Sequence, residues 1–391
     1  ANQGLLEFVE MFKAPIKMLH PLLTATQERN FKGTEGFGSI PFDGIILAHS
    51  NESEWQQFRN NKTNEAFLDR VYIVKVPYCL RVSEEVKIYE KLLEHSSLNK
   101  APCAPGTLNM MAQFSVLTRL KEPANSNLFS KMRVYDGENL KDVDPHAKPI
   151  QEYRDQSGPD EGMNGSSTRW AYKVLSKVFN FDHHEVAANP VHLLYVLEQQ
   201  VIKDNLPEEQ TRKYLDFIKS YLTPKYAEFV AKEIQTAYLE SYSEYGQNLF
   251  ERYIQFADKW IQNEEFRDPA TGQIFDRDSL NDELVRIEKP AGIANPKDFR
   301  NEVVNFVLRA QASNSGTMPA WTSYEKLREV IERSMFSKTE DLLPVISFDH
   351  KGSKESQEKH ENFVDRMVAK GYTEKQVRLL VEWHLRVKKA S

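Results

Sequence analysis

Three polar residues lie next to apolar, strand-like segments in the first fifth of the chain. Glu10 and Asn51 each follow such a segment, and Arg70 precedes another. Open α/β sheets bind ligands outside the carboxyl ends of their strands, where a carboxylate can polarise a water molecule and an amide can orient it. An arginine can reach a transferring phosphoryl group on an adjacent subunit. Each residue alone is more commonly a solvated surface group. Their order and spacing predict a nucleotide-hydrolysing α/β core.

The segments that must position these residues have the pattern of a small α/β unit. Residues 12–26 have helical spacing, and residues 31–40 carry the glycines of a hairpin with a flexible tip. The first strand is expected to be buried and central, and Pro77 ends the last one. The predicted strands are residues 5–9, 42–49 and 71–76.

Beyond this unit the apolar residues take helical spacing. Helices are predicted from Ser83, at residues 107–120 and at residues 170–179. Residues 121–161 are polar and rich in Pro, Asp and Gly, and we expect them to form an insertion with little core.

Residues 182–391 are predicted to be almost wholly helical. Thr223 and Asn295 each precede a proline, and we expect both to cap helices. An aromatic stripe at residues 224–266 favours a helical core seam over an aromatic ligand site. The sequence thus predicts a fold that is mixed α/β and then mainly α, with all-α structure at the C-terminal end. The predicted domains are residues 1–77 (α/β core), 78–181 (helical lid) and 182–391 (helical domain).

Composition argues against several classes of protein. Fifty-one Lys and Arg residues against 57 Asp and Glu residues give a net charge of −6, so no general cationic field is available for nucleic acid or anionic lipid. No apolar run approaches the roughly 20 residues that a membrane helix needs. Cys79 and Cys103 have neither metal-ligand spacing nor a disulfide framework. We expect a cytoplasmic protein with no nucleic-acid or membrane partner and no metal site of its own.

Four segments carry a resemblance to a known family. Residues 1–10 (Ala-Asn-Gln-Gly-Leu-Leu-Glu-Phe-Val-Glu) resemble the stretch leading into the Walker B strand of AAA+ ATPases of the magnesium-chelatase and MoxR-like kind. Asn51 matches the sensor-1 asparagine, and residues 68–70 (Leu-Asp-Arg) resemble the segment that bears the arginine finger. Residues 165–169 (Gly-Ser-Ser-Thr-Arg) resemble the sensor-2 motif that opens the third lid helix.

A closer resemblance is to the bacterial PrkA family of serine protein kinases, and it covers the whole chain. It is carried by residues 5–13 (Leu-Leu-Glu-Phe-Val-Glu-Met-Phe-Lys), 22–27 (Leu-Leu-Thr-Ala-Thr-Gln) and 114–120 (Phe-Ser-Val-Leu-Thr-Arg-Leu). The resemblance implies ATP-dependent phosphoryl transfer to protein serine, with ATP and Mg²⁺ as cofactors, a protein substrate and a homo-oligomeric ring.

The same resemblance implies a role for each candidate residue. Glu10 would be the base that polarises the nucleophile, Asn51 its orienter and Arg70 a finger acting in trans. Arg169 would contact the γ-phosphate of ATP in cis.

The sequence departs from the family pattern at two places. Val9 stands where the Walker B aspartate would be, and Glu7 could replace it as a metal ligand only if the strand bulges. No Gly-x-x-x-x-Gly-Lys-Ser/Thr occurs in the 391 residues, and the glycine-rich residues 33–38 lack the lysine. We therefore expect a C-terminal fragment that lacks the P-loop, binds ATP weakly and is inactive alone.

Two other functions agree with the same residues. One is an ATP-driven remodelling or protease-linked machine, and the other is a non-enzymatic protein-interaction module. The motifs of eukaryotic-type kinases, such as His-Arg-Asp and Asp-Phe-Gly, do not occur in the chain, so the AAA+ site would be the source of phosphoryl transfer.

Overall fold

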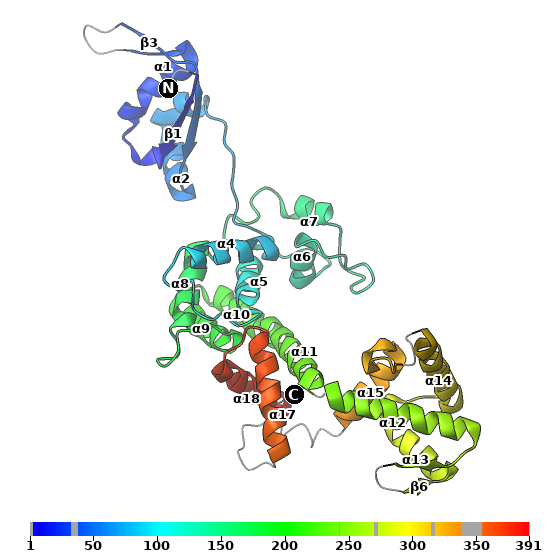
Figure 1. The fold of residues 1–391 in the computed structure, drawn as a ribbon. Helices are drawn as coiled ribbons and strands as arrows, with labels where there is room; N and C mark the ends of the chain where they lie inside the picture. Colours follow the sequence, from blue (N-terminus) through cyan, green and yellow to red (C-terminus); the bar gives the residue numbers. More distant parts are fainter. Residues whose placement is uncertain are drawn as a thin grey trace. The chain divides into compact units, whose positions relative to one another are not determined.

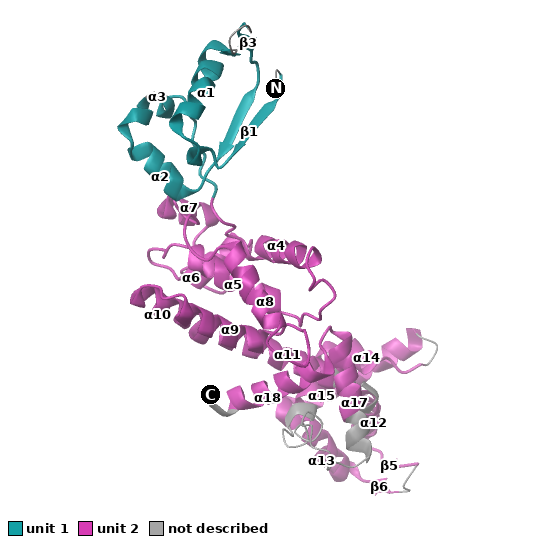
Figure 2. Cartoon of the chain, turned by 90° about the vertical axis from the view of Figure 1, so that its left-hand side faces the viewer, with its two compact units in different colours: residues 1–76 teal, residues 77–391 magenta. Residues whose placement is uncertain are grey.

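The computed structural model divides the chain into two units, residues 1–76 and residues 77–391 (Figure 2). Both are treated separately below. Among the described residues, no helix is long and apolar enough to cross a lipid bilayer. The described residues are 3–32, 38–241, 243–269, 273–313, 317–337 and 354–390.

The first unit is built on a pair of parallel strands. β1 (Leu5–Val9) runs beside β4 (Ile45–His49) in continuous register, from Leu5 opposite Ile45 to Val9 opposite His49. β2 pairs with β3 as an antiparallel hairpin. The other elements are η1 (Met11–Lys13), α1 (Ile16–Glu28), β2 (Asn30–Phe31), β3 (Ile40–Pro41), α2 (Glu52–Asn60), η2 (Lys62–Asn64) and α3 (Glu65–Leu68). The buried core contains Met11, Leu19, Leu22, Phe58 and Phe67.

Two strand predictions and the hairpin are confirmed in this unit, with the hairpin tip at residues 33–37 outside the described residues. The prediction of a third strand at residues 71–76 is wrong. That segment has no strand pairing in the described part of the chain, and Tyr72 is 93% exposed. β-branched residues favour strands only where a neighbouring strand completes the ladder.

The first strand is also less buried than predicted. Within the described residues β1 pairs with β4 alone, and the side chain of Val9 is 69% exposed. Burial alternates along β1, because the core residues pack against one face of the two strands and leave the other face open.

The second unit is helical except for the short antiparallel pair β5 (Phe266–Arg267) and β6 (Ile274–Phe275) (Figure 1). Its first core contains α4 (Val82–Glu94), α5 (Thr107–Arg119), α6 (Leu128–Tyr135), α7 (Ile150–Ser157), α8 (Thr168–Phe179), α9 (Pro190–Lys203), α10 (Glu208–Asp216), α11 (Thr223–Ser241), α17 (Lys354–Ala369) and α18 (Glu374–Ala390). Its second core contains α12 (Ser243–Gln262), α13 (Arg277–Glu288), α14 (Pro296–Ser313) and α15 (Glu325–Ser337). The last helices of the chain, α17 and α18, pack against α11.

One of the two predicted proline caps is confirmed. Asn295 accepts a hydrogen bond from the Asp298 amide at the start of α14. The prediction for Thr223 is wrong. It is the first residue of α11 but caps no helix, because α10, the π-helical turn η3 (Phe217–Leu222) and α11 follow one another without a break. The wider π turn accommodates Pro224, whose ring would clash with the carbonyl four residues earlier in a regular helix.

Residues 121–161 contain more core than predicted. They form α6 and α7, and the side chains of Met132 and Tyr153 are buried. The Pro, Asp and Gly residues that suggested an open insertion belong largely to the loops around these helices. The prediction that the aromatic stripe at residues 224–266 is core is confirmed for Tyr238, Tyr253 and Phe256.

A buried ion pair fixes the second core of this unit. The Arg300 side chain, 1% exposed, donates to both carboxylate oxygens of Glu288 at 2.7 Å and to Asn281 Oδ1 at 2.9 Å. The Tyr253 hydroxyl donates to Glu288 Oε1 at 2.9 Å. Every charge buried here is therefore paired and hydrogen-bonded.

Replacing Arg300 with methionine should destabilise this core. Arg300→Met leaves the Glu288 carboxylate buried without its cation, which costs about 3–5 kcal/mol in comparable cases. Chemical denaturation followed by tryptophan fluorescence measures the loss. Arg309→Met, at an exposed position of the same helix, is the matched control. Equal stability of the two variants would contradict the prediction.

Candidate functional site

The parallel strands bring two of the predicted site residues to one edge of the first unit. Val9 and His49 are paired at the carboxyl ends of β1 and β4, and Glu10 and Asn51 follow at that edge. Glu10 has a left-handed backbone with φ of 53°, which turns the chain from β1 into η1. The carboxylate and the amide thus lie where open α/β sheets bind ligands.

Lys13 contacts two carboxylates at this edge, those of Glu10 and Glu54. Its Nζ lies 2.7 Å from Glu10 Oε2 and 3.5 Å from Glu54 Oε1. Glu54 Oε2 accepts a hydrogen bond from Ser50 Oγ at 3.0 Å. Lys13, Ser50 and Glu54 were not among the predicted site residues.

Asn51 also has a structural role. It is the N-cap of α2, where its Oδ1 accepts hydrogen bonds from the Glu54 amide at 2.9 Å and from Ser53 Oγ at 2.8 Å. An N-cap asparagine satisfies amide groups that a helix leaves unpaired, which fixes the direction of its side chain.

Hydrogen bonding keeps this edge charged. The hydrogen bond to Glu10 raises the pKa of Lys13, because it favours the ammonium form. Burial alone would raise the pKa of Glu54, but hydrogen bonds from Ser50 and Asn51 and the charge of Lys13 lower it below its ordinary value. At neutral pH the edge therefore carries one cation between two carboxylates.

Glu7 could replace the Walker B aspartate as a metal ligand only if β1 bulged, and β1 has no bulge. β1 and β4 pair without a bulge, so Glu7 lies in mid-strand, with its Oε1 3.9 Å from His49 Nε2. Val9 offers no oxygen ligand, and the described residues contain no group of three or more His, Cys, Asp or Glu side chains able to hold a metal ion.

Arg70 lies elsewhere in the first unit. Its guanidinium donates to Gln27 Oε1 at 3.1 Å. Gln27 is near the end of α1, roughly 16 Å along the axis from the start of that helix at 1.5 Å per residue. This hydrogen bond places Arg70 beside the end of α1, and a contact with Glu10 and Asn51 made from a neighbouring subunit stays a prediction.

Arg169 belongs to the second unit, where it is exposed in the first turn of α8. Ser167 caps this helix by accepting a hydrogen bond from the Trp170 amide at 3.2 Å. Just before it, the Ser166 amide donates to Thr118 Oγ1 at 3.0 Å. The start of α8, and with it Arg169, is therefore fastened to the end of α5.

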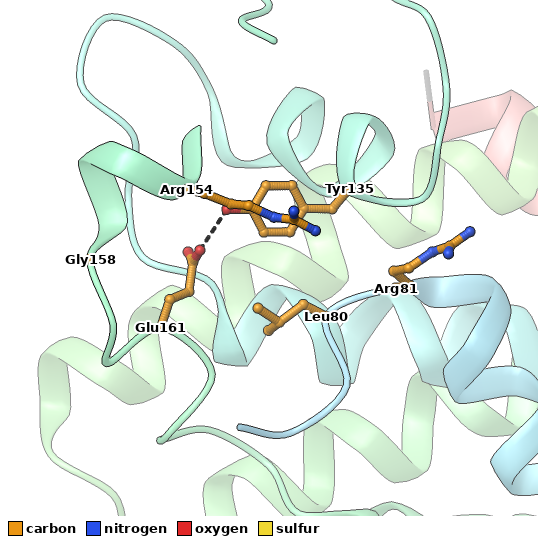
Figure 3. Close-up of a pocket in the computed structure, with 6 residues that line it drawn as sticks. All are labelled: Leu80, Arg81, Tyr135, Arg154, Gly158 and Glu161. Carbon is orange, nitrogen blue, oxygen red and sulfur yellow. Dashed lines mark hydrogen bonds between the residues drawn. The ribbon is translucent and has the colours of Figure 1, made fainter. Parts of the chain in front are cut away.

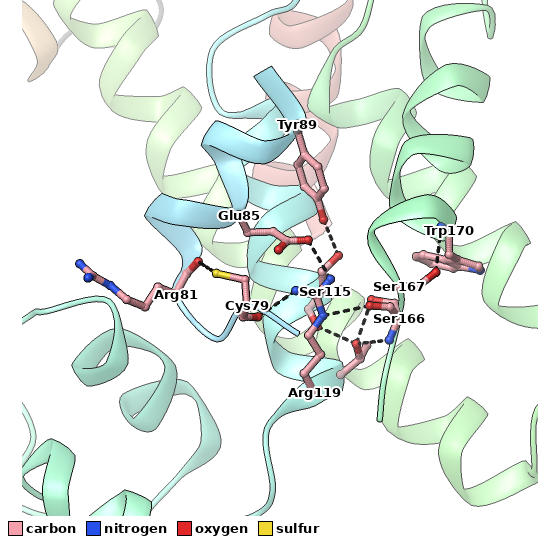
Figure 4. Close-up of polar contacts among 10 residues, drawn as sticks. Cys79, Arg81, Glu85, Tyr89, Ser115, Arg119, Ser166, Ser167 and Trp170 are labelled. Carbon is pink, nitrogen blue, oxygen red and sulfur yellow. Dashed lines mark hydrogen bonds and ion pairs between the residues drawn. The ribbon is translucent and has the colours of Figure 1, made fainter. Parts of the chain in front are cut away.

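A buried arginine adds to this contact between α5 and the loop before α8 (Figure 4). Arg119 donates through Nε to the Ser166 carbonyl at 2.9 Å and through Nη1 to the Cys79 carbonyl at 2.8 Å. Its Nη2 donates to Glu85 Oε1 at 2.7 Å, and both side chains of this ion pair are fully buried. Arg119 thus links α4, α5, the loop before α8 and the first residues of the second unit. In the sequence, Arg119 stands out only as part of residues 114–120, which resemble the PrkA family.

A cavity of about 180 Å³ lies beside this network (Figure 3). The Tyr135 hydroxyl donates to Glu161 Oε2 at 2.7 Å, and Lys131 forms a buried ion pair with the other Glu161 oxygen. Both carboxylate oxygens are therefore already engaged, and we assign the cavity no catalytic role. It is lined by Leu80, Arg81, Tyr135, Arg154, Gly158 and Glu161.

Two family models match the chain. The model for the PrkA AAA domain matches residues 1–127, and the model for the PrkA serine protein kinase C-terminal domain matches residues 129–383. No solved structure matches the chain.

Curated relatives carry two different activities in their names. The serine/threonine kinase YeaG of Escherichia coli (strain K12) is 73% identical over 391 residues, which cover 100% of this chain and 61% of that protein. The ATP-dependent protease PrkA of Bacillus subtilis (strain 168) is 35% identical over 354 residues, covering 89% of this chain and 54% of that protein. The chain thus spans less than two thirds of the length of these relatives.

Adding a methyl group at Gly165 should loosen the loop that precedes Arg169. Gly165 has φ of 109°, and a Cβ there would lie 2.7 Å from the Thr118 carbonyl oxygen and 2.8 Å from Arg119 Cγ. We expect Gly165→Ala to cost about 1–3 kcal/mol beyond the backbone strain itself and to speed hydrogen exchange at the Ser166 amide. Chemical denaturation and exchange measured by mass spectrometry report both effects.

The matched control is Gly137→Ala. Gly137 has a similar φ of 101° but no atom within 4 Å of the added Cβ. If the two variants lost equal stability and protected Ser166 equally, the loop would not depend on this close approach.

Proposed function

The chain belongs to the PrkA serine protein kinase family, and from this membership we propose that the intact protein transfers phosphate from ATP to protein serine at a site of AAA+ type. The observation that supports this most directly is the placement of Glu10 and Asn51 at one sheet edge, with Lys13 bound to Glu10. The family match to an AAA domain over residues 1–127 agrees with nucleotide use.

Glu10 is the general base in this proposal. When bound, ATP supplies the γ-phosphoryl group. The Glu10 carboxylate accepts the proton of the attacking seryl hydroxyl while the new oxygen–phosphorus bond forms and the bond to the ADP leaving group breaks. Asn51, held by its cap to α2, orients the nucleophile. Lys13 releases Glu10 when its ammonium turns to the incoming phosphate.

The two arginines complete the proposed site from different places. Arg70 acts in trans on the nucleotide of a neighbouring subunit, which requires a homo-oligomeric ring. Arg169 acts in cis as the contact to the γ-phosphate. The expectation that these 391 residues are inactive alone stays a prediction. The proposed site residues do not include ligands for Mg²⁺, because the Val9 side chain has no oxygen.

A second candidate function is an ATP-driven machine linked to protein remodelling or proteolysis. It is favoured by the name of the Bacillus subtilis relative, an ATP-dependent protease. In this case water takes the place of the seryl hydroxyl at Glu10. The two functions are distinguished by where the γ-phosphate of radiolabelled ATP goes, to protein or to free phosphate.

Removing the charge of Glu10 should strongly reduce both phosphate transfer to protein and release of free phosphate in the full-length protein. We expect Glu10→Gln to reduce phosphate transfer and phosphate release by about 10²–10⁴-fold, the usual contribution of a general base, without preventing ATP binding. Glu7→Gln, three residues earlier and within β1, is the control and should keep both activities. Retained transfer to protein in Glu10→Gln would require a second catalytic centre.

Arg70→Ala should lose about 10³-fold or more in rate if Arg70 is a trans finger. Mixing this variant with Glu10→Gln before ring assembly should restore part of the activity, because an interface can then join an intact Glu10 to an intact Arg70. Arg59→Ala, at an exposed position of α2, is the control for loss of a surface cation. Absence of recovery in mixed rings would remove Arg70 from the site.

A further inference from the structure

A groove on the second unit lies along α8 and α9, which lie side by side (Figure 1). Its volume is about 400 Å³, within the range of pockets that hold ligands. It is separate from the residues of the proposed nucleotide site. Its lining residues are Lys177, Asn180, Phe181, Tyr195, Val196, Gln199, Gln200 and Lys203.

Two exposed aromatic rings give the groove an apolar wall. Phe181 is 40% exposed and Tyr195 is 53% exposed. Their ring centroids lie 5.5 Å apart in an edge-to-face arrangement, and Phe181 also packs 4.5 Å from the His192 ring. The rings support each other in place, so a ligand can bury them without first ordering them. Aromatic side chains of this kind dominate the energetics of protein interfaces.

The groove is positively charged although the chain carries a net charge of −6. Lys177 and Lys203 are both exposed, and the eight lining residues include no acid. The nearest carboxylates along α9 are already engaged. Glu198 pairs with Lys219 at 3.0 Å, and Asp204 accepts a hydrogen bond from the Trp170 ring nitrogen at 2.6 Å.

Lys177 is positioned by a neutral group and not by a counter-ion. Its ammonium donates to Gln200 Oε1, and the Gln200 amide donates to Asp204 Oδ1 at 2.5 Å. The lysine is thus held at the groove wall with its charge uncompensated. In the part of the chain that the structure describes, Lys203 and the Gln199 amide have no hydrogen-bond partner, so both are available to a ligand.

We propose that this groove binds an acidic peptide segment of a partner protein, with an aromatic or aliphatic side chain packed against the exposed surfaces of Phe181 and Tyr195. The two lysines then contact carboxylates on either side of that anchor, and the Gln199 amide bonds the peptide backbone. A peptide fits better than a nucleic acid, because phosphate-backbone binding draws its affinity from many cations and the groove offers two. The complementary charges also favour a partner more acidic than this chain.

The test uses the 391-residue chain and a fluorescein-labelled peptide, Glu-Asp-Phe-Glu-Leu-Asp-Glu, in fluorescence anisotropy titrations. We expect saturable binding, and a Kd at least tenfold higher for Lys177→Glu/Lys203→Glu and for Tyr195→Ala. Lys232→Glu on α11 and Tyr72→Ala in the first unit, both at exposed positions, are the matched controls and should bind as the unmodified chain does. Circular dichroism confirms that each variant folds.

Three further measurements decide the nature of the ligand. A peptide with serine in place of Phe and Leu, and a peptide with lysine in place of Glu and Asp, should both bind at least tenfold more weakly. Binding of a labelled thymidine decamer in preference to the acidic peptide would overturn the proposal in favour of nucleic acid. Concentration-dependent self-association in sedimentation velocity that Tyr195→Ala abolishes would overturn it in favour of a second copy of the chain. Equal peptide binding by the groove variants and the controls would also overturn it.

Discussion

The organisation of the second unit around α8 depends on one buried guanidinium. Transferring an arginine and a glutamate from water into a protein interior costs several kcal/mol per ion, which a close ion pair and further hydrogen bonds offset. Arg119 binds Glu85 Oε1 and two backbone carbonyls, and its guanidinium also lies 5.1 Å from the centroid of the Tyr78 ring, whereas Glu85 Oε2 is buried without a hydrogen-bond partner. Because the carbonyls belong to Cys79 and Ser166, satisfying one side chain fixes two loops.

Patterns that depend on neighbouring residues in the chain were predictable. The apolar segment of β1, the spacing of α5 and the capping box from Thr373 to Gln376, whose two reciprocal hydrogen bonds measure 3.2 and 3.0 Å, follow from local sequence. The prediction of a third strand at residues 71–76 failed, because the composition of this segment favours a strand whether or not a partner strand is present. The π turn before Pro224 was missed for a similar reason, since a proline after threonine is typical of a helix start.

The candidate site shows the same limit. Glu10 and Asn51 could be placed at one edge because parallel strands end together. Lys13 and Glu54 could not, because their meeting depends on the left-handed turn at Glu10 and on the direction of α2. Hydrophobic periodicity did not identify Arg119 as a buried residue either. A single arginine at the end of an apolar helix resembles an ordinary C-terminal cation, and only the packed structure identifies its partners.

The family match and the packing divide the chain differently, and this has a mechanical consequence. The AAA domain match extends to residue 127, whereas the packing separates residues 1–76 from the rest. α4 and α5 therefore belong to the AAA match by sequence and to the helical unit by contact. α5 packs against α4, α6, α8 and α9. The side chains of seven of its residues are fully buried. Close-packed interiors transmit displacement instead of absorbing it. A displacement of α5 would therefore carry α8 and α9 with it, and the groove lined by Lys177 and Lys203 would move as part of the same body.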